Sequence, residues 1–307
     1  MNSPDKAPPT ERGLSIEREN RMVAYITLLP SAFILVLLVA VPAITVIGLS
    51  FTNSDLGGGG DSFAGWSNYV WVFLSPSFYH ALINTAIWVF GSVGTEMILG
   101  LGVSLLLNRS FFGRGVARAI TFAPYLIPTV VAVLVWRYMF HDVVGILNYL
   151  LMDVGIIDQP MNWLDSPSMA MFSVIVVGVW KFLPFSVLAL LAALQSIPQE
   201  QYEAARIDGA SDWQQFKRIT LPYVMPVFLL TALLRTIWTF HKFDIIYLMT
   251  GGGPMDATTT LPVLVYEKAF VDFEMGRAAA MAIVTAVILG VLLAAYFVLI
   301  RRAEARQ

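Results

Sequence analysis

The sequence of 307 residues has no cysteine, only three histidines and few charged side chains. The absence of cysteine excludes disulfides and thiolate metal sites, although it does not identify a compartment. Charged residues make up 13% of the chain and hydrophobic residues 57%, whereas soluble domains have about 25% and about 45–50%. The formal net charge of −2 gives no basic excess for binding nucleic acid. This composition predicts a membrane protein.

Signatures of catalysis and of nucleotide hydrolysis are also missing. The three histidines, His80, His141 and His241, are scattered, and neither H-E-x-x-H nor G-x-S-x-G occurs. No G-x-x-x-x-G-K-S/T loop, which would cradle phosphates, is present. We therefore expect a non-catalytic chain without a metal or cofactor, in which any ATP hydrolysis belongs to a separate subunit.

Long hydrophobic runs are abundant instead. A helix needs about 20 apolar residues to cross a hydrocarbon core of about 30 Å. Six runs reach that length, at residues 22–50, 81–107, 117–140, 170–194, 221–240 and 278–300. We expect an all-α, polytopic membrane protein with six transmembrane helices. Prolines in or beside these runs, among them Pro124, Pro128 and Pro184, predict kinks.

Arginine and lysine are distributed unevenly between the runs. They gather before the first run, after the second, between the fourth and fifth, and after the last, whereas residues 51–80 and 141–169 contain none. Because these side chains accumulate in cytoplasmic segments, we expect both termini in the cytoplasm. Residues 1–21 would then form a cytoplasmic tail, and residues 22–302 the transmembrane domain.

A polar segment at 196–222 separates the fourth and fifth runs. It contains Glu-Ala-Ala from Glu203, then Gly209, and Ile-x-Leu-Pro ending at Pro222. Residues 199–207 favour a helix that Asp208 and Gly209 end. Ser211 and Gln214 fit a capping box that opens a second short helix.

This spacing resembles the cytoplasmic coupling loop of ABC-importer permeases. Residues 250–254 (Thr-Gly-Gly-Gly-Pro) and 258–261 resemble the carbohydrate-uptake branch of the maltose and glycerol-3-phosphate type. The resemblance covers about residues 80–295. It implies the type I, MetI-like permease fold in a bacterial plasma (inner) membrane, and binding-protein-dependent sugar import.

The resemblance also implies partners: a second homologous permease, two ABC ATPase subunits and an extracytoplasmic sugar-binding protein. The ATPase would dock on the loop at Tyr202, Glu203, Ala204, Ala205, Arg206, Asp208 and Gly209. In this family the helices flanking the loop grip the sugar, which implies a substrate path at Gly178, Lys181, Phe182, Phe185, Arg235, Trp238 and Thr239.

Three ionisable residues inside the runs, Glu96, Lys181 and Arg235, leave two interpretations open. They line the path, or they pair structurally, Glu96 with either cation. The same architecture could import a polyol, a glycerophosphodiester, or a sulfonated or phosphorylated sugar. A more distant alternative is an ion-coupled secondary transporter, for which Glu96 is the one candidate acid in the runs. Residues 251–254 are either a tight turn or a contact for the binding protein.

Overall fold

The computed structural model describes residue 23, residues 25–55 and residues 62–304. The expected cytoplasmic tail, residues 1–21, lies outside the described residues. Helices dominate, and the only strand-like pairing in the described ranges is an isolated bridge between Thr52 and Phe63. The expected all-α class is confirmed.

The helices are named α, and three π-helical segments are named η. In chain order they are η1 (Val36–Ala40), α2 (Val41–Ser50), α3 (Ser67–Leu74), α4 (Pro76–Asn108), α5 (Arg114–Leu126), α6 (Thr129–Met139), α7 (Ile146–Asp153), α8 (Pro167–Gln195), α9 (Gln199–Ile207), α10 (Asp212–Gln215), η2 (Phe216–Thr220), α11 (Leu221–Phe240), α12 (Asp244–Thr250), α13 (Leu261–Tyr266), η3 (Glu267–Val271) and α14 (Met275–Glu304).

Five helices in the described part of the chain are long and apolar enough to cross a membrane. They are Tyr25–Ser50, Pro76–Asn108, Pro167–Gln195, Asp212–Phe240 and Met275–Val298. The expected span at 117–140 is not one helix, because α5 and α6 meet at a bend of 102°. Ile127 is extended there and precedes Pro128, which offers no N–H to continue a helix. The count of six holds only if the bent pair is one span.

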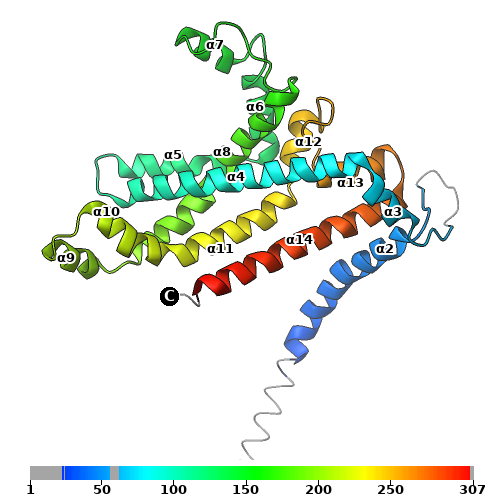
Figure 1. Cartoon of the computed structure of the whole chain (residues 1–307), viewed down its shortest axis with the longest axis horizontal. Helices are drawn as coiled ribbons and strands as arrows, with labels where there is room; N and C mark the ends of the chain where they lie inside the picture. Colours follow the sequence, from blue (N-terminus) through cyan, green and yellow to red (C-terminus); the bar gives the residue numbers. More distant parts are fainter. Residues whose placement is uncertain (1–22, 24, 56–61, 305–307) are drawn as a thin grey trace, which may run out of the picture.

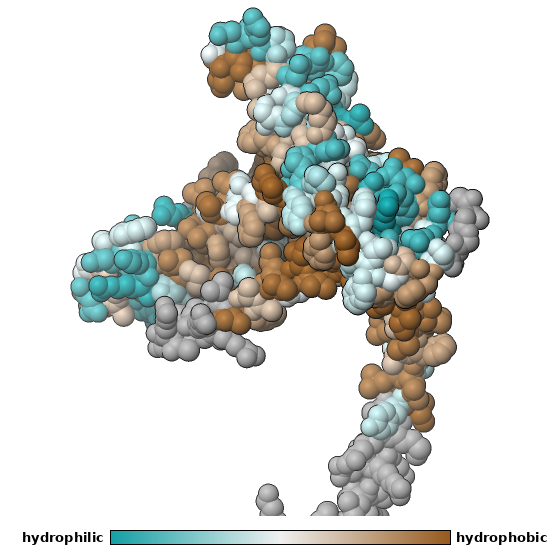
Figure 2. Space-filling view, turned by 45° about the vertical axis from the view of Figure 1, so that its right-hand side comes forward, coloured by the Kyte–Doolittle hydropathy of each residue, from teal (hydrophilic) through white to brown (hydrophobic). Residues whose placement is uncertain are grey.

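The long helices form a bundle in which α4 and α8 pack most extensively and α11 lies against both (Figure 1). Helices α9 and α10 lie at one end of the bundle, and α3, α12 and α13 lie at the other. Helices α6 and α7 project from its side, and α2 diverges from it after contacting α14. Hydrophobic side chains cover the surface between the two polar ends (Figure 2).

Trp88 joins three helices at the centre of the bundle. Its side chain is buried in α4, and its indole Nε1 donates a hydrogen bond of 2.9 Å to the Thr239 carbonyl of α11. The ring lies against Gly178 of α8, where an added Cβ would come within 2.5 Å of it. Glycine at this position therefore allows the close packing of α4 on α8.

Candidate coupling loop and substrate path

The loop between α8 and α11 folds as two short helices, as the sequence predicts. Helix α9 ends beside Gly209, whose φ of +77° forms the corner that glycine adopts without strain. The backbone N–H of Ser211 donates to Gln214 Oε1 at 2.8 Å, and the N–H of Gln214 donates to Ser211 Oγ at 3.4 Å. This capping box opens α10, so the start of this helix is set by residues of the loop itself.

The outer surface of α9 is open. No residue of this helix is buried, and Ile207 is 87% exposed. Within the described residues Glu203 makes no ion pair, and Ala204, Arg206, Asp208 and Gly209 are likewise exposed, with Ala205 half-buried.

Tyr202 faces the other way. Its hydroxyl lies 2.8 Å from Thr220 Oγ1, and its ring packs on the core of the bundle. The Tyr202 contact therefore holds α9 against the start of the next span, whereas Glu203 is exposed at the surface of the subunit.

Glu96 and Arg235 form a buried ion pair between α4 and α11. Arg235 Nε donates to Glu96 Oε2 at 2.6 Å, and Nη2 donates to Oε1 at 2.9 Å. The two side chains are 0% and 3% exposed. The Phe182 ring of α8 lies 4.6 Å from the guanidinium carbon, a cation–π contact. Of the two cations proposed for Glu96, the fold brings Arg235 to it.

Lys181 is buried elsewhere in α8 and does not pair with Glu96. Its ammonium donates to the carbonyls of Pro124 at 2.9 Å and Tyr125 at 3.2 Å, and also to that of Ile127. These atoms belong to the bend between α5 and α6. The sequence did not indicate these partners, because main-chain carbonyls carry no side-chain signal.

Only two of the proposed path residues are not buried. Gly178, Thr239, Lys181, Phe182, Arg235 and Glu96 lie inside the subunit. Phe185 of α8 is half-buried and Trp238 of α11 is 43% exposed; their ring centroids are 5.0 Å apart and edge-to-face. Trp238 also lines a shallow hollow of about 410 Å³, shared with Ile237, His241, Lys242, Phe243 and Asp244.

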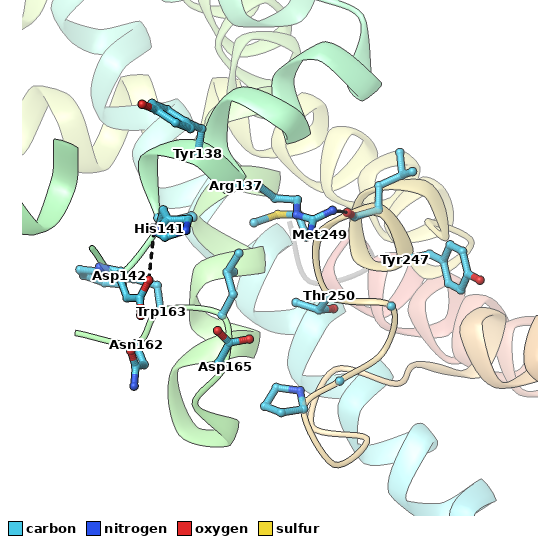
Figure 3. Close-up of a pocket in the computed structure, with 16 residues that line it drawn as sticks. Arg137, Tyr138, His141, Asp142, Asn162, Trp163, Asp165, Tyr247, Met249 and Thr250 are labelled. Carbon is cyan, nitrogen blue, oxygen red and sulfur yellow. Dashed lines mark hydrogen bonds and ion pairs between the residues drawn. The ribbon is translucent and has the colours of Figure 1, made fainter. Parts of the chain in front are cut away.

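A larger hollow of about 720 Å³ lies at the end of the bundle away from α9, between α6, residues 162–165, α12 and residues 251–254 (Figure 3). Arg137 reaches from α6 toward α12, where its Nη1 donates to the Leu248 carbonyl at 3.2 Å. His141 and Asp142 lie on the side of the hollow away from α12, with His141 Nδ1 3.0 Å from Asp142 Oδ1. The glycine-proline turn at 251–254 borders this hollow, which the sequence alone did not delineate.

Near this turn lies a group of carboxylates outside the spans. Burial raises the pKa of Glu267, and the neighbouring Asp256 and Asp272 raise it further, whereas Lys268 opposes them. Lys268 Nζ binds Asp272 Oδ2 at 2.6 Å. Among the described residues no group of three or more histidines, aspartates and glutamates is arranged to hold a metal ion.

This arrangement defines a class of protein: a polytopic helical membrane protein with the fold of ABC-importer permeases. A bacterial ABC transporter involved in the import of alginate has that fold, with a TM-score of 0.81 at 23% identity over 94% of this chain and 98% of that chain. The MetNI methionine ABC transporter matches with a TM-score of 0.54 at 16% identity, over 75% of this chain and 99% of that chain.

The chain belongs to the family of binding-protein-dependent transport system inner membrane components, which it matches over residues 96–306. It is 38% identical over 257 residues to the trehalose/maltose transport system permease protein MalF of Thermococcus litoralis, covering 83% of this chain and 86% of that one. It is 33% identical over 266 residues to the sulfoquinovosyl glycerol transport system permease protein SmoG of Agrobacterium fabrum, covering 86% of each. The family expected from the 202–222 spacing is confirmed.

Proposed function

We propose that this chain is one of two permease subunits of an ATP-driven sugar importer. A binding protein delivers the sugar at the end of the bundle that carries α12. Two ATPase subunits bind at the end that carries α9 and drive the conformational change of the bundle. Relatives named for trehalose/maltose and sulfoquinovosyl glycerol transport support a carbohydrate substrate. The observation that carries the proposal is the open surface of α9 around Glu203.

The coupling role follows from the physics of α9. A nine-residue helix is marginal in water by itself, and the bundle covers only Tyr202 and Ala205 of it in part. Its small Ala204 lets another backbone approach, and the carboxylate of Glu203 suits an arginine or lysine on a partner. Docking on an ATPase subunit would stabilise the short helix and give the Glu203 carboxylate a cationic partner. The loop connects α8 to α11. A displacement of α9 therefore acts directly on both of these spans.

The energy required is within reach of such a contact. Shifting a two-state bundle from about 1:99 to 99:1 needs about 5.5 kcal/mol of differential binding. Losing one partner of a desolvated interfacial charge pair costs about 2–5 kcal/mol. Contacts at two such loops, one on each permease, supply this order of magnitude when they are made in one state of the bundle and lost in the other.

The proposed substrate path follows the partly exposed aromatic pair of Phe185 and Trp238. The two rings are in edge-to-face contact and partly exposed, where a second permease would close a shared cavity, and ligand sites are lined mainly by hydrophobic and aromatic side chains. Arg235 and Thr239 of the same helix as Trp238 are buried, and Arg235 Nη2 lies 3.5 Å from Thr239 Oγ1. Lys242, beside Trp238, offers a cation to an anionic sugar, which is the second candidate substrate class favoured by the likeness to SmoG.

Ion-coupled transport receives less support. It needs an acid that can take up and release a cation, and Glu96, buried in α4, already accepts hydrogen bonds from Nε and Nη2 of Arg235. The proposed topology puts both termini in the cytoplasm. For the C-terminus it is supported by α14, whose C-terminal end lies toward the end of the bundle that carries α9 (Figure 1).

The test is transport in proteoliposomes that contain the full complex, with the binding protein outside. We expect sugar uptake with ATP inside and none with an ion gradient alone. Glu203→Lys should abolish uptake and the stimulation of ATP hydrolysis by loaded binding protein. Asp158→Lys, the same charge change at an exposed site, should preserve both.

Uptake driven by an ion gradient without ATP would contradict the proposal. So would a Glu203→Lys complex that assembles and transports at the wild-type rate, because the open carboxylate of α9 would then have no partner.

A further inference from the structure

Lys181 places a charge inside the subunit without a carboxylate in ion-pair contact among the described residues. Its side chain is 4% exposed, and its ammonium donates to three main-chain carbonyls, those of Pro124, Tyr125 and Ile127. An ammonium group has three N–H donors. All three N–H groups therefore donate to carbonyls of this chain, and none is left to donate to a substrate hydroxyl.

The three carbonyls lie where the third span breaks. The last carbonyls of a helix have no partner within the helix, and α5 ends at an extended residue followed by Pro128, which has no N–H. The chain then turns by 102° into α6. A cation at a helix C-terminus is also favoured by the helix dipole. Lys181 thus performs for α5 the capping that the next backbone residues cannot.

The position of Lys181 connects the two ends of the subunit. Toward one end, α8 continues about 20 Å from Lys181 to Gln195, at about 1.5 Å per residue, and enters the α9 loop. Toward the other end, α6 starts at the bend and carries Arg137, which binds the Leu248 carbonyl of α12 beside the hollow of about 720 Å³. The hydrogen bonds of the Lys181 ammonium are the polar contact that joins α8 to the start of α6 at the bend.

We propose that Lys181 is a positioning residue that fastens the α5–α6 bend to α8, so that α6 and the hollow beside Arg137 follow the movement of α8. This inference rests on the proposed function, since α8 is displaced only if an ATPase subunit binds the α9 loop and moves it. It replaces direct contact between Lys181 and the substrate, which the sequence had suggested.

The experiment uses the absence of cysteine in this chain. In the full transporter in lipid, spin labels are placed on Val135→Cys of α6 and Phe172→Cys of α8, both exposed positions. A control pair, Leu106→Cys of α4 and Leu188→Cys of α8, reports a contact that Lys181 does not touch. Distances within each pair are measured by electron–electron double resonance, with and without a non-hydrolysable ATP analogue.

We expect Lys181→Met to broaden and shift the α6–α8 distances and to leave the α4–α8 distances unchanged. Lys268→Met, which removes a lysine that pairs with Asp272 and Glu274, should leave both unchanged. Lys181→Gln keeps two N–H donors and should give an intermediate result, which decides the question if Lys181→Met does not assemble. The maximal transport rate of Lys181→Gln should fall about 2- to 30-fold, the range of single coupling residues, at unchanged KM.

Wild-type α6–α8 distances in both Lys181 variants would overturn the inference, as would a raised KM for the sugar at a normal maximal rate. The distance measurement needs no transport. Its outcome is therefore separate from that of the proposed function, which fails if the wild-type complex itself does not couple ATP to uptake.

Discussion

The buried pair of Glu96 and Arg235 permits a quantitative prediction. Its two hydrogen bonds, at 2.6 and 2.9 Å, join side chains that are 0% and 3% exposed. Removing one partner of such a pair leaves an uncompensated charge, at a cost of about 3–5 kcal/mol. Replacing both partners by apolar side chains of similar volume costs far less, because no charge remains buried. The single variants and the double variant should therefore differ sharply.

The variants are Glu96→Met, Arg235→Met and their combination, and the assay is thermal unfolding of the purified transporter in detergent. At roughly 2–4 °C per kcal/mol, the conversion for domains of about 150–250 residues, each single variant should lower Tm by about 6–20 °C. The double variant should recover most of that loss, with an interaction energy of at least about 2 kcal/mol.

Two results would refute this reasoning. Additive losses in the double variant would mean that the two side chains do not depend on each other. Single variants with the wild-type Tm would mean that the charges are hydrated, as they would be if both lined an open path instead of a packed helix contact.

Other predictions concern packing, protonation and substrate contact. Gly178→Ala should lower Tm, because its Cβ would come within 2.5 Å of an indole ring, whereas Gly94→Ala, with open space around it, should not. Because the pKa of Glu267 is raised in the folded state, the stability it contributes below about pH 4.5 is lost as pH rises; Glu267→Gln should therefore raise Tm at pH 8, with no gain below pH 4.5. Trp238→Ala should raise the KM for sugar uptake, whereas Phe172→Ala, at an exposed position of α8 outside the proposed path, should leave KM unchanged.

The features that local sequence determines were predictable. The bounds of α9, the glycine corner and the Ser211–Gln214 capping box each depend on neighbours within a few residues. Five of the six hydrophobic runs likewise predicted a spanning helix, because length and apolar content decide whether a helix can cross a bilayer. The family followed from spacing in the loop.

The features that depend on distant contacts were not. A hydropathy window averages over Pro124 and Pro128, so residues 117–140 read as one helix although the chain bends by 102°. Glu96 and Arg235 are 139 residues apart, and the sequence offered Lys181 as an equal partner. Which cation meets the carboxylate is set by the packing of α11 on α4, and this arrangement has no local signature.

Contact between α9 and an ATPase subunit is the central claim, and site-directed crosslinking tests it most directly. A photoreactive label is attached to Ala204→Cys, on the open surface of α9, and to Ile98→Cys, which is exposed on α4 within a span. In the assembled transporter the label at Ala204 should capture the ATPase subunit, with a yield that changes when ATP binds, and the label at Ile98 should not. Failure of Ala204→Cys to capture the ATPase in a complex that still transports would contradict the account.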